Sequence, residues 1–245
     1  MTTTAAPPAP QLTAVRRTGV GWLAVVLTSL GIIAFSAMPY FMASLADLAE
    51  QGTGLASGYA DQAAFVQAAL YVHIAAASVA LLVGPWQFSA RLRNGRRRLH
   101  RILGRTYLLS VAAGALASLV IAPFNTAGMV GFFGFGTLGV LWLWTGGRAY
   151  RAIRSGDVHA HQSWMIRNFA LSYAAVTLRL LTISLTAVQV PFSQDPGGSF
   201  EAAFENAYNA VPFLCWLVNL VVAEWLIRRR GLPSFRLVDP ARAVG

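Results

Sequence analysis

The chain has 245 residues, of which 56% are hydrophobic and only 11% are charged, whereas an ordinary soluble domain carries about 25% charged residues. Its 19 basic residues outnumber its 9 acidic residues, the formal net charge is +10, and every basic residue is an arginine. Without lysine the chain can form neither a Schiff base nor a phosphate-binding P-loop. The single cysteine, Cys215, excludes an intrachain disulfide and a C-x-x-C redox pair. This composition is typical of an integral membrane protein.

Six apolar segments are long enough to cross a bilayer, which requires about 20 mostly apolar residues. They cover approximately residues 19–44, 66–89, 106–123, 128–147, 163–187 and 207–227. We therefore predict an all-α fold, an integral membrane bundle of six transmembrane helices within residues 19–230. The first segment is longer than the apolar core of a signal peptide, so we expect it to be retained. Residues 1–18 and 231–245 are expected to be flexible tails.

Apart from Arg179, the arginines lie on or near one side of the predicted membrane domain. They precede the first segment, separate the second from the third and the fourth from the fifth, and follow the sixth: Arg16, Arg17, the seven arginines from Arg91 to Arg105, Arg148, Arg151, Arg154 and Arg228–Arg230. The alternate connections, residues 45–65, 124–127 and 188–206, contain no arginine, and the first and third of them carry acidic residues. The positive-inside rule then places both termini in the cytoplasm, with the chain in the inner (cytoplasmic) membrane. Basic loops of this kind favour anionic lipid headgroups as partners over nucleic acid.

Polar residues at membrane depth are costly and usually face a bundle interior or a cavity. In a continuous fifth helix, His161 and Arg179 would be five full turns apart on one face, with Asn168 and Ser172 close to the same line. His73 on the second segment is expected at a similar depth to Arg179. We predict that His73, Asn168, Ser172 and Arg179 line a ligand pocket. The alternative is that these side chains only join helices to one another by hydrogen bonds.

Two further histidines, His100 and His161, are expected at the cytoplasmic edge of the third and fifth segments. A b-type haem needs two axial ligands on opposite sides of one ring, so this pair predicts a haem b site. Arg101, Arg105 and Arg167 are the candidates to bind the haem propionates, because arginine binds carboxylates with two parallel hydrogen bonds.

A weaker pattern lies just before the fifth segment. Asp157, His159 and His161 form D-x-H-x-H, whose carboxylate and imidazoles are plausible metal ligands. The alternative is that Asp157 caps the helix that begins near His159. On the sixth segment, Glu224 lies four residues before Arg228, a spacing that suits an ion pair within one helix.

The sequence resembles an uncharacterised family of bacterial multi-pass membrane proteins, domain of unknown function 2306. The resemblance rests on His73, Gly84-Pro85-x-Gln87-Phe88, His100-Arg101-x-x-Gly104-Arg105-x-Tyr107, Gly156-Asp157, His161-x-x-Trp164-Met165-x-Arg167-Asn168-x-Ala170-Leu171 and Ala174-Ala175-Val176-Thr177-Leu178-Arg179. It implies an integral membrane protein and no particular reaction. His159 lies outside these motifs, and His161 is followed by Gln162 where the family commonly has arginine.

Three functions remain open. The first is a membrane redox protein that holds haem b and exchanges electrons with a quinone or a membrane partner protein. The second is a transporter, channel or sensor for a small molecule or ion, with a polar pathway along the fifth segment. The third is a structural subunit. A hydrolytic enzyme is disfavoured because the chain has no G-x-S-x-G or H-E-x-x-H motif, and whether it is an enzyme of another kind stays undecided.

Overall fold

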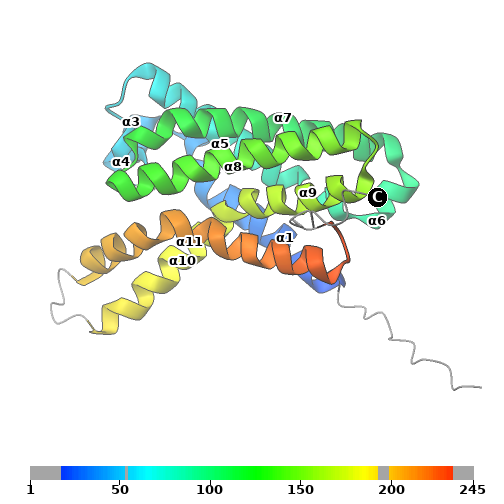
Figure 1. Cartoon of the computed structure of the whole chain (residues 1–245). Coiled ribbons are helices and arrows are strands. Elements are labelled where there is room, and N and C mark those ends of the chain that lie inside the picture. The colour runs from blue at the N-terminus through cyan, green and yellow to red at the C-terminus, as the bar shows by residue number, and fades with distance from the viewer. Residues whose placement is uncertain (1–17, 53–54, 193–198, 234–245) are drawn as a thin grey trace, which may run out of the picture.

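A computed structural model describes residues 18–52, 55–192 and 199–233, and within these ranges the chain is helical with no β-strand (Figure 1). Six of its helices are long and apolar enough to cross a membrane, which confirms the predicted fold class. Their cores are α1 (Thr18–Ile32), α5 (Ala64–Val83), α7 (Arg97–Ile121), α8 (Gly128–Arg154), α10 (Ala174–Gln189) and α11 (Ser199–Arg229). The predictions for most of the two tails fall outside the described residues.

Shorter helices connect these six. The first candidate span continues from α1 into a π-helical turn, η1 (Ile33–Ala37), and Pro39 then opens α2, where its missing N–H group is tolerated. The remaining short elements are α2 (Pro39–Met42), α3 (Leu45–Glu50), α4 (Ala56–Tyr59), η2 (Pro85–Phe88), α6 (Ala90–Gly95), η3 (Ala122–Phe124), α9 (Val158–Ser172) and η4 (Val190–Phe192). The arginine-rich connection after α5 is therefore largely helical, since α6 and the first turns of α7 cover most of it.

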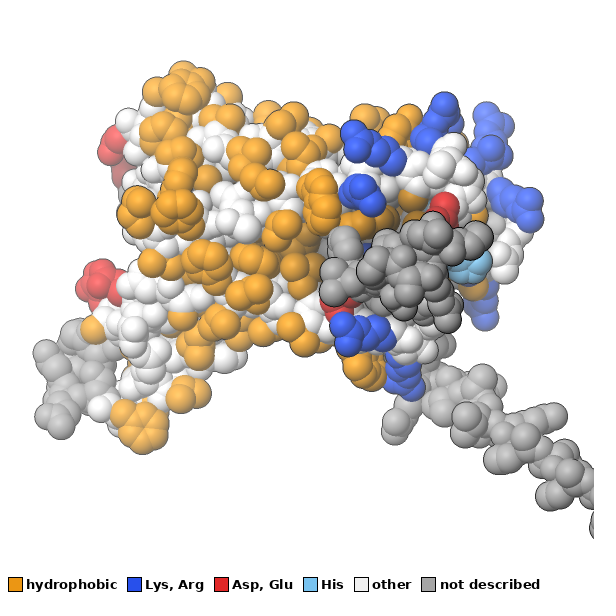
Figure 2. Space-filling model, viewed as in Figure 1, with side chains coloured by type: hydrophobic (Ala, Val, Ile, Leu, Met, Phe, Trp, Pro, Cys, Tyr) orange, Lys and Arg blue, Asp and Glu red, His pale blue; other side chains and the backbone are white. Residues whose placement is uncertain are grey.

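The outer surface of the bundle is apolar, as contact with lipid requires. Large hydrophobic side chains on several different helices are strongly exposed, among them Leu109 at 71%, Val140 at 54% and Val221 at 70%. Figure 2 shows the arginine side chains gathered at one end of the molecule, with a broad hydrophobic surface extending from there towards the other end. We call the arginine-rich end the basic end.

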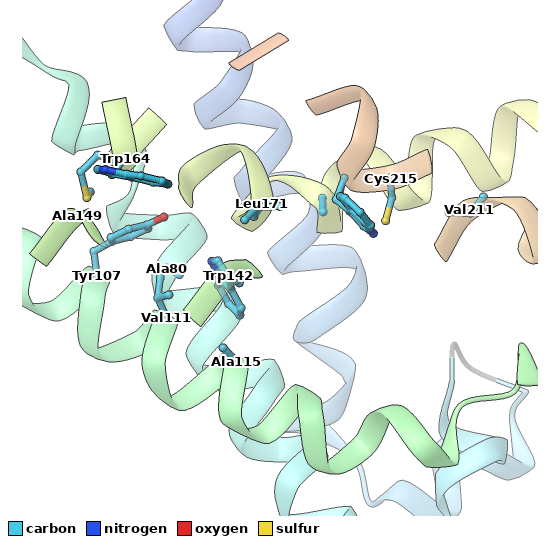
Figure 3. Packing of buried hydrophobic residues seen from close by; sticks show 13 residues of the cluster. Ala80, Tyr107, Val111, Ala115, Trp142, Ala149, Trp164, Leu171, Val211 and Cys215 are labelled. Carbon is cyan, nitrogen blue, oxygen red and sulfur yellow. The ribbon is translucent and has the colours of Figure 1, made fainter. Parts of the chain in front are cut away.

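The core lies between α5, α7, α8, α9 and α11, and its centre is aromatic. Tyr107 and Val111 of α7 pack with Trp142 of α8 and Leu171 of α9 (Figure 3). Cys215 belongs to the same buried cluster and is a free thiol. This cluster brings helices that are distant in the sequence into one packed unit.

The glycine-rich helix α8 approaches α11 closely at one point. A Cβ atom added at Gly134 would lie 2.6 Å from Pro212 Cβ and 2.8 Å from the Pro212 carbonyl carbon. A backbone carbonyl cannot rotate away as a side chain can, so only glycine fits there. Trp216 donates from Nε1 to the Gly134 carbonyl oxygen at 3.2 Å. Small residues permit this kind of close contact between membrane helices.

The predicted continuous fifth helix is interrupted, and this corrects the sequence-based expectation. Helix α9 ends at Ser172, α10 begins at Ala174, and the candidate span is Ala174–Phe192. Because of the break at Tyr173, His161 and Arg179 do not lie on one regular helical face. The Tyr173 hydroxyl is hydrogen-bonded to Thr28 on α1 at 2.7 Å, and Asn219 on α11 donates to the Ala170 carbonyl oxygen at 3.1 Å. The second bond satisfies a carbonyl in the last turn of α9 that helix geometry leaves open.

Candidate functional site

A pocket of about 540 Å³ opens on the side of the bundle near the basic end. We call it the lateral pocket. Residues of α8, α9 and α11 line it: Leu141, Trp144, Thr145, Arg167, Leu171, Leu217, Leu220, Val221, Glu224, Trp225 and Arg228. Most of these side chains are apolar, and the charged ones are Arg167 of α9 with Glu224 and Arg228 near the C-terminal end of α11. Such a volume is within the range of ordinary small-molecule sites.

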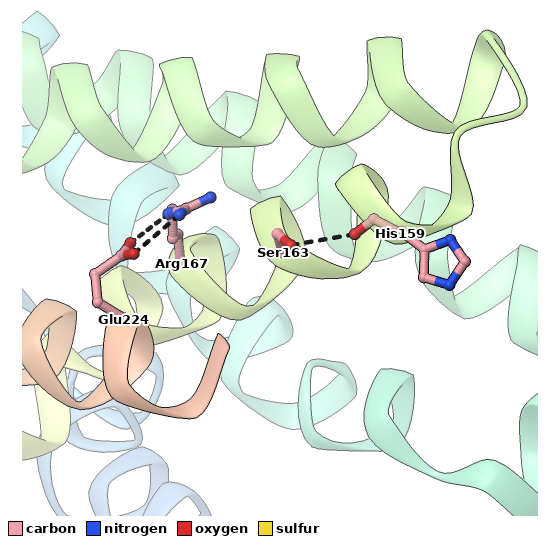
Figure 4. A network of polar contacts seen from close by, with 4 residues as sticks. All are labelled: His159, Ser163, Arg167 and Glu224. Atoms are coloured by element: carbon pink, nitrogen blue, oxygen red, sulfur yellow. Dashed lines mark hydrogen bonds and ion pairs between the residues drawn. The ribbon is translucent and has the colours of Figure 1, made fainter. Parts of the chain in front are cut away.

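An ion pair forms the polar part of the lateral pocket. Arg167 on α9 donates from Nε to Glu224 Oε1 at 2.5 Å and from Nη2 to Oε2 at 3.0 Å (Figure 4). The Arg167 side chain is 6% exposed, whereas that of Glu224 is 34% exposed. Glu224 of α11 therefore forms its ion pair with Arg167 of a different helix, α9. The prediction that Glu224 pairs with Arg228 of its own helix is wrong. Bidentate geometry compensates a buried guanidinium better than a single contact does.

Indole rings surround this ion pair. The Arg167 guanidinium lies 4.8 Å from the centre of the Trp164 ring, and the Arg148 guanidinium lies 5.2 Å from it. Trp144 meets Trp164 edge to face, with 5.0 Å between ring centres. Cation–π contacts of this kind strengthen when water is excluded. They hold the α9 cation in a fixed position beside the lateral pocket.

Asn168 and Ser172 take part in a buried hydrogen-bond network. Tyr107 donates to Asn168 Oδ1 at 2.7 Å, and its hydroxyl is 2.8 Å from Ser172 Oγ. Asn168 Nδ2 donates to the Trp142 carbonyl oxygen at 2.7 Å and to Thr145 Oγ1 at 2.8 Å, while Trp142 Nε1 donates to Ser172 Oγ at 2.8 Å. Tyr107 and Asn168 are both fully buried. The network supplies these polar groups with partners and joins α7, α8 and α9, as expected for polar contacts between membrane helices.

His161 and His100 lie within electrostatic range of each other. His161 Nδ1 is 2.9 Å from the Ala149 carbonyl oxygen. A carbonyl can only accept, so Nδ1 carries the proton and Nε2 of the neutral ring is the one with a lone pair. Burial lowers the pKa of His161, and the bond to Ala149 opposes this effect. His100 Nδ1 is buried and has no hydrogen-bond partner within the described part of the chain.

The three arginines predicted to bind haem propionates do not share one environment. Arg101 and Arg105 are exposed, whereas Arg167 is buried and bound to Glu224. Neither His100 nor His161 lines the lateral pocket.

The residues of the D-x-H-x-H pattern are not brought together. Asp157 Oδ1 accepts from the Ala160 backbone N–H at 2.8 Å and so caps α9. His159 is exposed, and its ring points away from the bundle in Figure 4. Among the described residues, no group of three or more histidine, cysteine or acidic side chains is arranged to hold a metal ion. The capping alternative describes Asp157 correctly.

His73 and Arg179 lie near each other deeper in the bundle. The His73 side chain interacts electrostatically with Arg179, and its Nδ1 is 2.9 Å from the Gly114 carbonyl oxygen. Arg179 donates from Nε to Ser36 Oγ of η1 at 3.1 Å. The two residues are thus placed together, while Asn168 and Ser172 belong to the separate network around Tyr107.

A family model described as "Predicted membrane protein (DUF2306)" matches residues 70–227, which is well over half of the chain. The chain belongs to the DUF2306 family. Comparisons with curated proteins and with solved structures give no match. The DUF2306 match begins within α5 and ends near the last turn of α11, so it includes the ion pair, the lateral pocket up to Glu224 and Trp225, and the Tyr107 network. It confirms the family suggested by the sequence motifs.

Sequence reasoning did not identify several residues of the lateral pocket. The sequence pattern marks Trp144 and Trp225 only as members of apolar segments. For Glu224 the spacing predicts an ion pair with Arg228, whereas the partner is Arg167. One signal was available: Glu224 is the only acidic residue within the predicted sixth span, and a lone carboxylate at membrane depth requires a cationic partner from another helix or from its own.

Proposed function

We propose that this DUF2306 protein binds a lipid-soluble quinone in the lateral pocket. The supporting observation is the pocket itself, which combines an apolar wall, two indole rings and a polar group of fixed geometry. Leu141, Leu217 and Leu220 provide a wall that suits an isoprenoid tail. The Arg167–Glu224 pair sits beside the arginine-rich end of the wall, where a polar headgroup would lie. A ligand dissolved in the bilayer would reach the site from the side.

The chemistry of the pocket suits a flat ring with carbonyl acceptors. Trp144 and Trp225 are 47% and 54% exposed, so each offers a large aromatic face to a planar ring. The Arg228 guanidinium and the Trp225 indole N–H are hydrogen-bond donors, and quinone oxygens accept such bonds. Glu224 remains about one third exposed. Its carboxylate is therefore accessible to a ligand as well as to Arg167.

The same chemistry favours a quinone over a phospholipid headgroup. A phosphate placed against Arg228 would share the pocket with the Glu224 carboxylate, and like charges at short range repel. The Arg167–Glu224 pair is neutral as a unit, so it carries no excess positive charge for a phosphate. A neutral ring avoids this repulsion and still accepts hydrogen bonds.

A titration tests the proposal. Ubiquinone-1 and menadione are added to the full chain in mild detergent, and binding is followed by quenching of tryptophan fluorescence. Arg228→Gln replaces a charged donor by a shorter neutral one and should weaken binding about tenfold, because a hydrogen bond to a charged group contributes about 1.5 kcal/mol. Trp225→Phe removes a neutral donor, worth about 1 kcal/mol, and should weaken binding about fivefold. Arg230→Gln is the matched control, since Arg230 is an exposed arginine of the same basic end that does not line the pocket, whereas Arg229 lies over the Trp225 ring.

Equal affinity in all variants would contradict the proposal. So would loss of quinone binding on addition of phosphatidylglycerol, because that result would assign the pocket to an anionic lipid.

A haem b between His100 and His161 is a second candidate, and it rests on the unpaired buried Nδ1 of His100. Arg167 is already bound to Glu224, and Arg101 and Arg105 are exposed, which gives less support to their role with propionates. The haem assignment stays a prediction. Purified protein should show a Soret band that is lost in both His100→Ala and His161→Ala, and a chain without such a band after growth with haem precursor contradicts it.

The other functional hypotheses draw less support from the geometry. A polar pathway along the fifth segment would pass Asn168 and Ser172, whose hydrogen-bonding groups are already paired in the Tyr107 network. That network equally suits a structural subunit, so the quinone titration also separates a binding protein from a purely structural one.

We also propose that the basic end faces the cytoplasm, where anionic lipid headgroups would contact its arginines. Glu50 and Arg154 are both exposed, and Arg154 belongs to the basic end. In intact cells a membrane-impermeant maleimide should label Glu50→Cys and leave Arg154→Cys unlabelled until the cells are opened. Cys215 is buried and gives a low background. The reverse labelling pattern contradicts this orientation.

A further inference from the structure

Arg179 is a cation placed deep in the membrane domain. It lies on α10, within the candidate span Ala174–Phe192, and interacts electrostatically with Tyr208 and Cys215 of α11. The middle of α11, which runs from Ser199 to Arg229, falls close to Cys215. Arg179 therefore lies within the membrane-spanning part of the bundle, between Cys215 near the middle of α11 and Ser36 at the end of the first span, and its side chain is only partly exposed.

The described residues do not neutralise the charge of Arg179. Its Nε donates to the Ser36 hydroxyl at 3.1 Å. Within residues 18–52, 55–192 and 199–233, no carboxylate lies within ion-pair distance of it, and Arg167–Glu224 is the ion pair found there. The groups in its electrostatic range include Tyr40, Tyr208 and His73. A charged side chain within a membrane span is costly, so a guanidinium without a carboxylate partner there marks a candidate site for an anion.

The backbone is irregular on the three helices that meet around Arg179. Ser36 lies in the π-helical turn η1, Tyr173 interrupts the path from α9 to α10, and Pro212 lies inside α11. Irregular backbone at membrane depth is tolerated where protein buries it or where it lines a cavity, and π-helical turns are frequent at functional sites. Interrupted helices near the membrane midplane are also a common setting for binding of charged ligands.

We propose that Arg179 is the anchor of a second binding site, within the membrane-spanning part of the bundle, for a small carboxylate anion. The guanidinium matches a carboxylate through two parallel hydrogen bonds, which a spherical halide cannot form. The Ser36 hydroxyl holds Nε and so orients the guanidinium. His73 lies within its electrostatic range, and His73 Nδ1 is hydrogen-bonded to the Gly114 carbonyl oxygen. This site shares no residue with the lateral pocket, so it does not depend on quinone binding.

Formate is the probe for this site. The full chain in mild detergent is titrated with sodium formate at constant ionic strength, with sodium gluconate as the bulky replacement, and the thermal unfolding midpoint is recorded. A ligand that binds only the folded state raises this midpoint saturably. We expect such a rise for wild type, none for Arg179→Gln, and a rise with about tenfold weaker apparent affinity for Arg179→Lys, which keeps the charge without the planar fork. Arg154→Gln is the control and should respond like wild type.

Two results overturn the proposal. One is a saturable formate effect that Arg179→Gln retains, and the other is a response to chloride as large as that to formate. In gluconate alone, Arg179→Gln should be at least as stable as wild type, because it removes an uncompensated charge. If Arg179→Gln does not fold, Ser36→Ala carries the test, since it releases the guanidinium from its hydroxyl partner. An unchanged formate affinity in Ser36→Ala then counts against the site.

Discussion

Arg167 on α9 and Glu224 on α11 are joined by two hydrogen bonds of 2.5 and 3.0 Å, although 57 residues separate them in the sequence. The cation is almost completely buried and the carboxylate is about one third exposed. This asymmetry makes the pair both a connection between two helices and an accessible polar group at the lateral pocket.

Removing one member of the pair should destabilise the protein. Glu224→Ala leaves the Arg167 guanidinium buried without its carboxylate, which costs about 3 kcal/mol, the low end for a buried pair because Glu224 is partly exposed. The double variant Arg167→Ala with Glu224→Ala should lose less than the sum of the two single variants, as measured by denaturant unfolding in detergent. Glu205→Ala, at an exposed glutamate near the other end of α11, is the control. Strict additivity would count against a coupled pair.

The Tyr107 network should respond to loss of a single hydroxyl. Tyr107→Phe removes the donor to Asn168 Oδ1 and leaves that oxygen buried without its 2.7 Å bond, which costs about 2 kcal/mol. Tyr150→Phe, at a tyrosine that is 55% exposed, should change stability by less than about 0.5 kcal/mol. The unfolding midpoints of both variants check this. Equal midpoints would show that the network contributes nothing measurable.

Two glycines of α8 should respond in opposite directions. At Gly134 a new Cβ would meet the backbone of Pro212 at 2.8 Å, so Gly134→Ala should destabilise by about 2 kcal/mol through overpacking. At Gly136 nothing lies within 4 Å of the new Cβ. Gly136→Ala should be neutral or stabilising by up to about 1 kcal/mol, because alanine is the better helix former. Thermal unfolding of the two variants side by side is the measurement, and similar destabilisation in both would contradict the packing of α8 on α11.

His161 should make stability depend on pH. Its folded-state pKa is lowered by burial from an ordinary value of 6.5. Below pH 6.5 the unfolded chain therefore takes up a proton more readily than the folded chain, and stability falls as the pH falls. His161→Gln should flatten the decline of the unfolding midpoint between pH 7 and pH 5, whereas His159→Gln, at an exposed position, should retain it. A wild-type slope in His161→Gln would contradict this account.

Segment length and hydropathy were sufficient to predict the six membrane helices, because each crossing requires a long apolar stretch whatever it packs against. The break at Tyr173 was not predictable in the same way, since neither proline nor glycine marks it. It is held instead by tertiary contacts, such as those of Tyr173 with Thr28 and of Thr177 with Asn219 at 2.9 Å.

For a similar reason, the residues and contacts of the candidate site could be predicted only in part from the sequence. The sequence motifs include Arg167, Asn168 and Arg179, so these residues could be predicted as candidates. The spacing along one helix predicts an ion pair between Glu224 and Arg228, whereas Glu224 pairs with Arg167. Likewise, the partners of His73 and His161 are backbone carbonyl oxygens, which no sequence pattern marks. Residue type showed which groups need a partner, and only packing determined which partner each obtained.

Filling the lateral pocket tests quinone binding most directly. Leu217 lines the pocket and is 42% exposed, while its neighbour Val218 does not line it and is 41% exposed. Leu217→Trp should occupy the space of the tail and abolish binding of ubiquinone-1, whereas Val218→Trp should bind as wild type does, with both variants folded as judged by their unfolding midpoints. Undiminished ubiquinone-1 binding in folded Leu217→Trp would contradict the assignment of the lateral pocket to a quinone.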